Sequence, residues 1–219
     1  PQPLLRQPAA TEQPVIEVAI HPLDAVPDRP TTAVVGAASG GGLQVTRPTG
    51  AVKRLGDADA VWLASDAVHV VWVDPCAACD AASAAARRGL HVYDLVADSD
   101  TRLLADRLPR FNEVKLGSDQ LAVLLPSAAR ANAAVLRVFD LDTGGTHDLS
   151  TRALAIGGGM HPLLALQDDQ VAWVDVLGTT RDLTLRVWDL AAEGDRQPAL
   201  ALVEVPEALV VSQALVAWR

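Results

Sequence analysis

Two cysteines, Cys76 and Cys79, form a C-x-x-C motif and are the only cysteines of the 219-residue chain. Such a pair can form a disulfide, exchange disulfides with another thiol, or supply half of a four-thiolate zinc site. The zinc site is excluded within this chain because no other cysteine exists, and Asp80 follows Cys79 where covalent haem attachment requires histidine. We predict a local disulfide in the long loop of residues 75–89, a feature typical of exported proteins. Two inert thiols and redox catalysis stay open as alternatives.

The other residue types that support chemistry lack the spacing that a reaction or a ligand site needs. The triplets Gly40–Gly42 and Gly157–Gly159 do not precede a predicted helix, so neither is expected to cradle a phosphate. Ser39 lacks the G-x-S-x-G context of a hydrolase nucleophile. No calcium-binding loop is completed by any of the recurring acidic pairs, Asp57/Asp59, Asp98/Asp100, Asp140/Asp142 and Asp168/Asp169. His69 and His91 fall on adjacent predicted strands and can approach each other, but we expect ordinary packed or solvent-facing histidines. The sequence therefore predicts no catalytic, cofactor-binding or metal-ligating residue.

The elements that position these residues are indicated by a short phrase that recurs along the chain. It reads LQVTR, LHVYDL, LRVFDL and LRVWDL, and its central valines are separated by 47, 46 and 49 residues: Val45, Val92, Val138 and Val187. Apolar residues alternate with polar ones within the phrase, which is the period of a half-buried strand. A period of this length indicates a repeated unit of β-strands.

The clearest repeat consists of four predicted strands at residues 161–167, 171–176, 183–190 and 199–205, separated by polar or glycine-containing turns. The same template divides the chain into units at 15–57, 58–110, 111–160 and 161–206, with a partial unit at 207–219. Residues 1–14 carry four prolines and read as a linker or tail, which is compatible with a tether upstream. A four-stranded antiparallel sheet cannot bury both faces alone, so a radial stack of such sheets, a β-propeller, is the predicted all-β fold.

The VWDL and VFDL endings, followed by glycine-containing turns, resemble the repeats of WD40-like and TolB-like β-propellers. The resemblance covers most of residues 30–219. It departs from WD40 repeats because no unit opens with Gly-His, and from TolB-like repeats because Ser-Asp-Gln or Asp-Asp-Gln stands in place of Pro-Asp-Gly. Propellers of these kinds usually have six or more blades, so the resemblance implies that about four and a half blades form an incomplete ring here.

The loops between the second and third strands of the units vary in length, at residues 36–42, 75–89, 126–134 and 177–182. In a propeller these loops emerge on one face, and variable loops on a regular scaffold are a common way to build a binding surface. We therefore expect a protein partner to bind this face. The candidate contact residues in the loops are Asp80, Arg87, Arg88, Arg130, Asn132, Thr179 and Arg181.

Composition narrows the remaining possibilities. The net charge of −9 and the scattered basic residues argue against a nucleic-acid surface, and no apolar run is long enough to span a membrane. We expect a non-catalytic binding or scaffold module without a cofactor, in an extracytoplasmic or membrane-associated assembly. Two alternatives remain: a propeller that belongs to a larger hydrolase-type enzyme whose catalytic domain lies outside this chain, and an intracellular WD-like adaptor with reduced cysteines.

Overall fold

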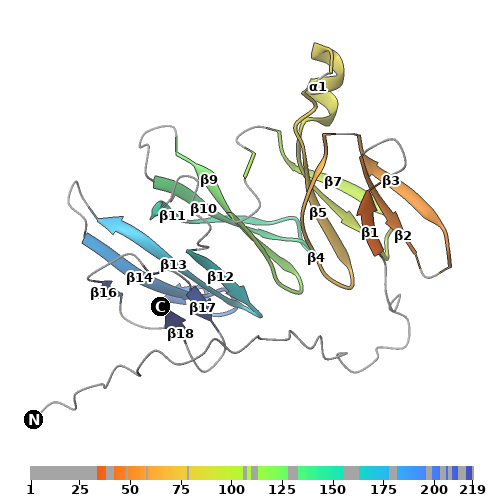
Figure 1. Cartoon of the computed structure of the whole chain (residues 1–219). Coiled ribbons are helices and arrows are strands. Elements are labelled where there is room, and N and C mark those ends of the chain that lie inside the picture. Colours follow the sequence, from red (N-terminus) through yellow and green to blue (C-terminus); the bar gives the residue numbers. More distant parts are fainter. Residues whose placement is uncertain are drawn as a thin grey trace, which may run out of the picture.

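The protein is described from a computed structural model, in which the chain is built almost entirely of antiparallel β-strands (Figure 1). The described residues are 34–37, 42–47, 49–57, 59–77, 79–105, 108–109, 113–127, 133–154, 163–177, 182–195, 199–202, 206, 209–211 and 216–218. Within these ranges one short helix, α1 (Ala81–Arg87), interrupts the strands. The all-β prediction is therefore confirmed.

The strands form consecutive antiparallel sheets in chain order. The first sheet contains β1 (Val34–Ala37), β2 (Leu43–Thr46) and β3 (Val52–Gly56). The second contains β4 (Val61–Ser65), β5 (His69–Asp74), β6 (Gly89–Asp94) and β7 (Ser99–Leu104). The third contains β8 (Val114–Leu116), β9 (Gln120–Pro126), β10 (Ala133–Asp140) and β11 (Thr146–Leu154).

The fourth group of strands contains β12 (Leu164–Gln167), β13 (Gln170–Leu177) and β14 (Asp182–Asp189). β14 pairs with two described segments, β15 (Gly194–Asp195) and β16 (Leu200–Leu202), and β16 lies within the strand predicted at 199–205. A final antiparallel pair, β17 (Leu209–Val211) and β18 (Val216–Trp218), lies within the partial unit expected at 207–219. Residues 15–33 of the first predicted unit and the linker at 1–14 lie outside the described residues.

The third and fourth groups are joined by one residue pair, which makes them a continuous nine-stranded sheet. Ala153 of β11 pairs with Asp175 of β13. The buried Asp175 carboxylate accepts hydrogen bonds from the Ser150 hydroxyl at 2.6 Å and from the Trp173 indole nitrogen at 2.7 Å. This link between neighbouring units was not predicted, since the repeat gives no sign of pairing between them.

Each central strand contributes side chains to two hydrophobic clusters, one on each face of its sheet. On β5, Val70 and Trp72 face a cluster shared with the first sheet, and Val71 and Val73 face a cluster shared with β8–β10. The alternation follows from the two-residue period of a strand. The same division holds for β9 and β13, so sheets pack face to face in sequence along the chain.

The first strands of successive sheets also contact one another. β4 contacts β8, β8 contacts β12, and β12 contacts β17. A series of sheets that pack face to face, with their first strands adjacent, is the arrangement of successive blades in a propeller-type fold. Figure 1 shows the sheets following one another in this order, from orange to blue.

The aspartate of the recurring phrase ends the third strand and closes the turn behind it. Its carboxylate accepts hydrogen bonds from backbone N–H groups two or three residues later, as Asp does in turns. The bonds run from Val96 and Ala97 to Asp94, from Asp142 and Thr143 to Asp140, and from Ala192 to Asp189. The leucine that follows donates its N–H to the turn between the first two strands, as Leu95 to Val68, Leu141 to Asp119 and Leu190 to Asp169. The phrase is thus a device for closing both turns at one end of a unit.

His69 and His91 are both buried. They do not face each other, because the register of β5 and β6 places His69 opposite Asp94 and His91 opposite Trp72. All five tryptophans fall in predicted strands, where core packing is expected, but Trp62 on β4 is 44% exposed. A bulge between Trp62 and Ala64 shifts the register against β5 at this point.

Candidate functional site

The long loop of the second sheet leaves and returns to the sheet at one point. Asp74, the last residue of β5, pairs with Gly89, the first residue of β6, so residues 75–88 form an insertion beyond the end of the ladder. The insertion carries α1, none of whose residues is buried. Figure 1 shows α1 standing away from the sheet beyond β5. The loop that sequence reasoning predicted as part of a binding face is therefore an exposed, structured element.

The insertion begins with the predicted pairing of the two cysteines. Cys76 and Cys79 form a disulfide, with Cα atoms 5.3 Å apart. Cys76 is buried, its backbone N–H donates to Asp74 Oδ1 at 2.9 Å, and Cys79 donates its N–H to the Cys76 carbonyl at 3.2 Å. The disulfide and these bonds fix the chain directly before the helix.

Both ends of α1 are capped by side chains. The Asp80 carboxylate accepts a hydrogen bond from the Ser83 N–H at 2.8 Å, and this bond is the main reason that the pKa of Asp80 is lowered. At the other end, the Arg102 guanidinium donates to the carbonyls of Ala85 and Ala86 at 2.7 and 3.1 Å. A cation at this end also interacts favourably with the helix dipole. Since a seven-residue helix is unstable by itself, these caps and the disulfide are what maintain it.

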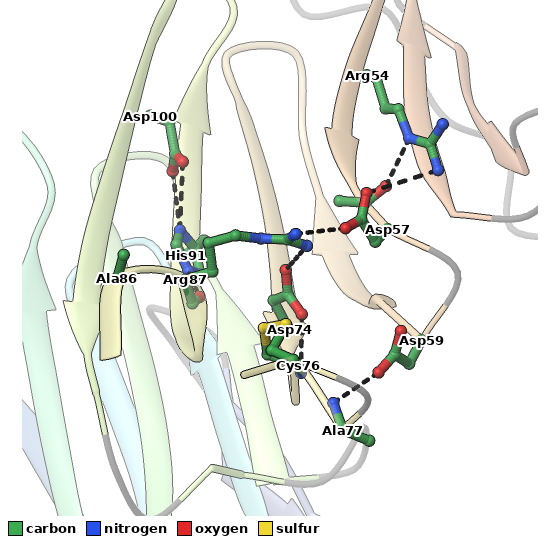
Figure 2. A network of polar contacts seen from close by, with 12 residues as sticks. Arg54, Asp57, Asp59, Asp74, Cys76, Ala77, Ala86, Arg87, His91 and Asp100 are labelled. Atoms are coloured by element: carbon green, nitrogen blue, oxygen red, sulfur yellow. Dashed lines mark hydrogen bonds and ion pairs between the residues drawn. A yellow bond between two sulfur atoms is a disulfide. The ribbon is translucent and has the colours of Figure 1, made fainter. Parts of the chain in front are cut away.

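A network of ion pairs attaches the insertion to the sheets below (Figure 2). Arg87, the last residue of α1, binds Asp74 Oδ2 at 2.9 Å and also pairs with Asp57, in the connection between β3 and β4. Hydrogen bonds with Asp74 and Asp57 raise the pKa of the Arg87 guanidinium, so it stays charged. From the same connection, Asp59 accepts a hydrogen bond from the Ala77 N–H at 2.7 Å. The insertion is therefore held at its start and at its end against the first and second sheets.

His91 completes the attachment from β6. Its Nδ1 lies 3.1 Å from Asp100 on β7, and its Nε2 lies 2.8 Å from the backbone carbonyl of Arg87. The ring stacks on Trp72, with centroids 5.0 Å apart. Figure 2 shows His91 between Asp100 and the end of the helix.

A second polar cluster lies on the same face of the second sheet, around Tyr93, two residues beyond His91. The Tyr93 hydroxyl donates to Asp98 and accepts a hydrogen bond from Arg47 Nη2 at 2.8 Å. Lys53 Nζ binds Asp98 Oδ1 at 2.6 Å and lies 4.6 Å from the centroid of the Tyr93 ring. This cluster joins β2 and β3 to β6 and to the turn before β7.

The predicted contact residues differ in what the structure says of them. Asp80 and Arg87 serve the insertion itself, one as a helix cap and the other as an ion-pair anchor. The side chain of Arg88 is exposed. The remaining four, Arg130, Asn132, Thr179 and Arg181, lie outside the described residues.

Sequence reasoning missed the residues that hold the insertion from outside it, among them Asp57, Asp74, His91 and Arg102. One signal was available for His91. It occupies the position of the recurring phrase at which the next two units have Arg137 and Arg186, so a change of residue type marks this unit.

Within the described part of the chain, no three or more His, Cys, Asp or Glu side chains are grouped so that they could hold a metal ion. In the same ranges no helix has the length and apolar character needed to cross a membrane. The polar groups around the insertion bind one another and the backbone, and these contacts attach the insertion to the sheets.

No protein-family model matches the sequence, and no curated protein matches it. Solved structures similar to the chain include a computationally designed protein, at 16% identity and a TM-score of 0.46 over 85% of this chain and 52% of that protein. A puromycin-hydrolyzing peptidase of Mycobacterium tuberculosis is similar at 15% identity and a TM-score of 0.45, over 75% of this chain and 26% of the peptidase. The β-propeller domain of the trilobed protease from Pyrococcus furiosus is similar at 9% identity and a TM-score of 0.37, over 68% of this chain and 48% of that domain. The chain spans about half of the length of these structures, or less.

Proposed function

We propose that this chain is a non-catalytic binding module of the propeller type, and that the insertion at residues 75–88 is its principal contact with a protein partner. The observation that carries the proposal is that a helix with no buried residue is nevertheless fixed at both ends. A disulfide, a helix cap, an arginine on the terminal carbonyls and an ion-pair network all act on one short segment. An exposed segment that is fixed in this way contributes little to the core, so a role at the surface accounts best for its attachments.

The surface of the insertion fits a protein partner. Its exposed helical side chains are small and apolar, at Ala81, Ala82, Ala85 and Ala86, and they allow a partner to approach the helix closely. The exposed Arg88 next to this surface would pair with a carboxylate of the partner. Because the helix is already ordered, binding loses less conformational entropy than binding to a flexible loop would.

The disulfide supports an extracytoplasmic location as part of the same proposal, since such bonds persist in oxidising compartments. The test is alkylation of the protein as isolated under native conditions. Modification of the two cysteines only after reduction is expected. Modification without reduction would favour the intracellular adaptor instead.

The proposed contact is tested by site-specific photo-crosslinking of the full chain in its native host. A photoreactive residue at Ala82 or Ala85 is expected to capture one and the same protein. The control position is Thr143, which is exposed in the turn between β10 and β11 at the other end of its sheet. Equal capture from Thr143, or no capture from the two helix positions, would contradict the proposal.

Capture should also depend on the order of the helix. The double change Cys76→Ser and Cys79→Ser removes the disulfide without adding a charge, and we expect it to reduce crosslinking from Ala82 more than tenfold. Circular dichroism of the same variant verifies that the sheets are intact. Undiminished crosslinking would show that a fixed helix is not what the partner recognises.

A further inference from the structure

The third and fourth strands of successive units are joined by a recurring polar pair. In the third unit Arg137 Nε binds Asp148 at 2.6 Å, and in the fourth unit Arg186 Nη2 binds Asp195 at 2.7 Å. In the second unit the corresponding pair is His91 and Asp100, at 3.1 Å. An arginine stays charged at any pH below about 12, whereas a histidine changes charge near neutrality. Among these three pairs, only the one in the unit that carries the insertion has a basic partner whose charge changes near neutrality.

The contacts of His91 require that its ring carries both protons. Nδ1 faces the carboxylate of Asp100, and Nε2 faces the carbonyl oxygen of Arg87 at 2.8 Å. Both partners are acceptors, and a neutral imidazole can donate from only one nitrogen. The two bonds are thus satisfied together only by the imidazolium.

The surroundings of His91 favour that charged form. Asp74 on β5, Asp100 on β7 and the Arg87 carbonyl of α1 present negative charge or acceptors to the ring, and the face of Trp72 stacks on it. Burial lowers the pKa of His91, but these hydrogen bonds and charges outweigh it and raise the pKa above 6.5.

Two cations also lie around the ring, and both are already paired. The guanidinium of Arg87 is held between Asp57 and Asp74. Arg102, the residue opposite His91 on β7, donates to the carbonyls of Ala85 and Ala86. The ion pair with Arg87 weakens the attraction of Asp74 for the ring, but Asp100, which bonds the ring directly, is paired with neither arginine.

Loss of one proton would break the bond to the helix rather than the bond to Asp100. A hydrogen bond to a carboxylate is stronger than one to a neutral carbonyl, so the remaining proton stays on Nδ1. The lone pair of Nε2 then faces the lone pairs of the Arg87 carbonyl, which is repulsive. The carbonyl must move away or bind water.

We propose that His91 is a pH-dependent clamp on the C-terminal end of α1, closed when the ring is protonated and open when it is neutral. The clamp holds the residues next to Arg88, where the proposed binding surface ends. Its effect on partner binding rests on the proposed function, and the partner is expected to bind more tightly on the acidic side of the transition.

The sign of the pH dependence follows from linkage. A histidine whose pKa is raised by folding stabilises the folded form fully below its unfolded value of about 6.5. That stabilisation is lost as the pH rises through the raised value in the folded protein. The clamp therefore opens as the pH rises through the raised pKa of His91 in the folded protein.

The test uses NMR on the full chain between about pH 5 and pH 9, the range in which histidine changes charge. Long-range nitrogen–proton spectra report the protons on each ring nitrogen of His91. Hydrogen exchange, corrected for the intrinsic rate at each pH, reports the Arg88 N–H, which donates to the Ala84 carbonyl at 3.0 Å. We expect protons on both nitrogens at acidic pH, only Nδ1 protonated at alkaline pH, and a roughly tenfold loss of Arg88 protection between them, the size of one lost hydrogen bond.

The variant His91→Arg supplies the matched control, because arginine stands at the equivalent position of the next two units. Its charge does not change in this range, so the protection of Arg88 should be independent of pH. A neutral His91 ring at acidic pH, or wild-type protection that does not change through the titration, would overturn the proposal. These measurements need no partner, so failure of the crosslinking experiment would leave the clamp standing, and failure of the clamp would leave the binding surface standing.

Discussion

His91 and Tyr93 lie two residues apart on β6 and face the same side of the second sheet, yet they are fastened by different chemistry. His91 binds the insertion through a group that changes charge near neutrality. Tyr93 is held by Arg47, Lys53 and Asp98, whose charges are constant over the same range. One end of the strand therefore responds to pH while the other does not.

The attachment at Tyr93 does not change with pH near neutrality because of the environment of Asp98. Hydrogen bonds from Lys53 and Tyr93, with the nearby charge of Arg47, lower the pKa of this carboxyl to about 2. Asp98 stays ionised in all but strongly acidic solution. The comparison shows how neighbouring positions of one strand can separate a permanent attachment from a reversible one.

The largest loss of stability is expected from Trp72→Ala, which removes packing at both His91 and Tyr93. Trp72 is fully buried, belongs to the cluster that includes Tyr93, and stacks on His91. Loss of such a side chain costs about 3–5 kcal/mol in the free energy of unfolding. Urea denaturation measures it, and Trp62→Ala, opposite Trp72 in the register but 44% exposed, is the control. Equal losses for the two variants would contradict the role assigned to burial.

Removal of the disulfide should separate the two ends. The bridge joins cysteines three residues apart, and closure of so short a loop is worth about 2 kcal/mol. In the double change Cys76→Ser and Cys79→Ser we expect hydrogen exchange to accelerate in α1, while the amides near Tyr93 keep their protection. Acceleration at both places would mean that the two ends are not independent.

The dependence of stability on acidic pH tests the attachment at Tyr93 and Asp98. Since folding depresses the pKa of Asp98, its contribution is present above the unfolded value of 3.8 and is lost as the pH falls through about 2. Asp98→Asn should remove this part of the acid dependence. Asn tolerates the left-handed backbone at this position, where φ is 55°, so the change removes the charge without adding backbone strain. Thermal unfolding at several acidic pH values measures it, with unchanged dependence as the contrary result.

The smallest effect on stability is expected at the exposed end of the insertion. Arg88 donates to the helix through its backbone N–H, and its side chain is exposed. Arg88→Ala should alter the free energy of unfolding by less than about 0.5 kcal/mol. If Arg88 contacts the partner, capture from Ala82 should nevertheless decrease. A large loss of stability would instead give Arg88 a structural role.

The repeat allowed much of the fold to be predicted. The LRVFDL and LRVWDL phrases became β10 and β14, because alternation fixes which side chains are buried and Asp140 and Asp189 end the strands by closing turns. The pairing of β15 with β14 was not predicted, since Gly194 reads as a turn residue.

The candidate site was predictable only in part. Local spacing was enough for the pairing of Cys76 and Cys79. The partners of the insertion are not local: Asp57 precedes it by a strand pair, and Arg102 follows it by a strand. Contacts of this kind depend on strand register, which a single sequence specifies poorly.

The single pairing of Ala153 with Asp175 has a consequence for how the chain comes apart. In an array of repeats, each unit contacts only its neighbours, so a unit can unfold by breaking only the interfaces with those neighbours. A hydrogen-bonded seam, reinforced by Ser150 and Trp173 on the same carboxylate, makes the third and fourth groups of strands one cooperative block. Under a mechanical load applied along the chain, these two groups are therefore expected to unfold together.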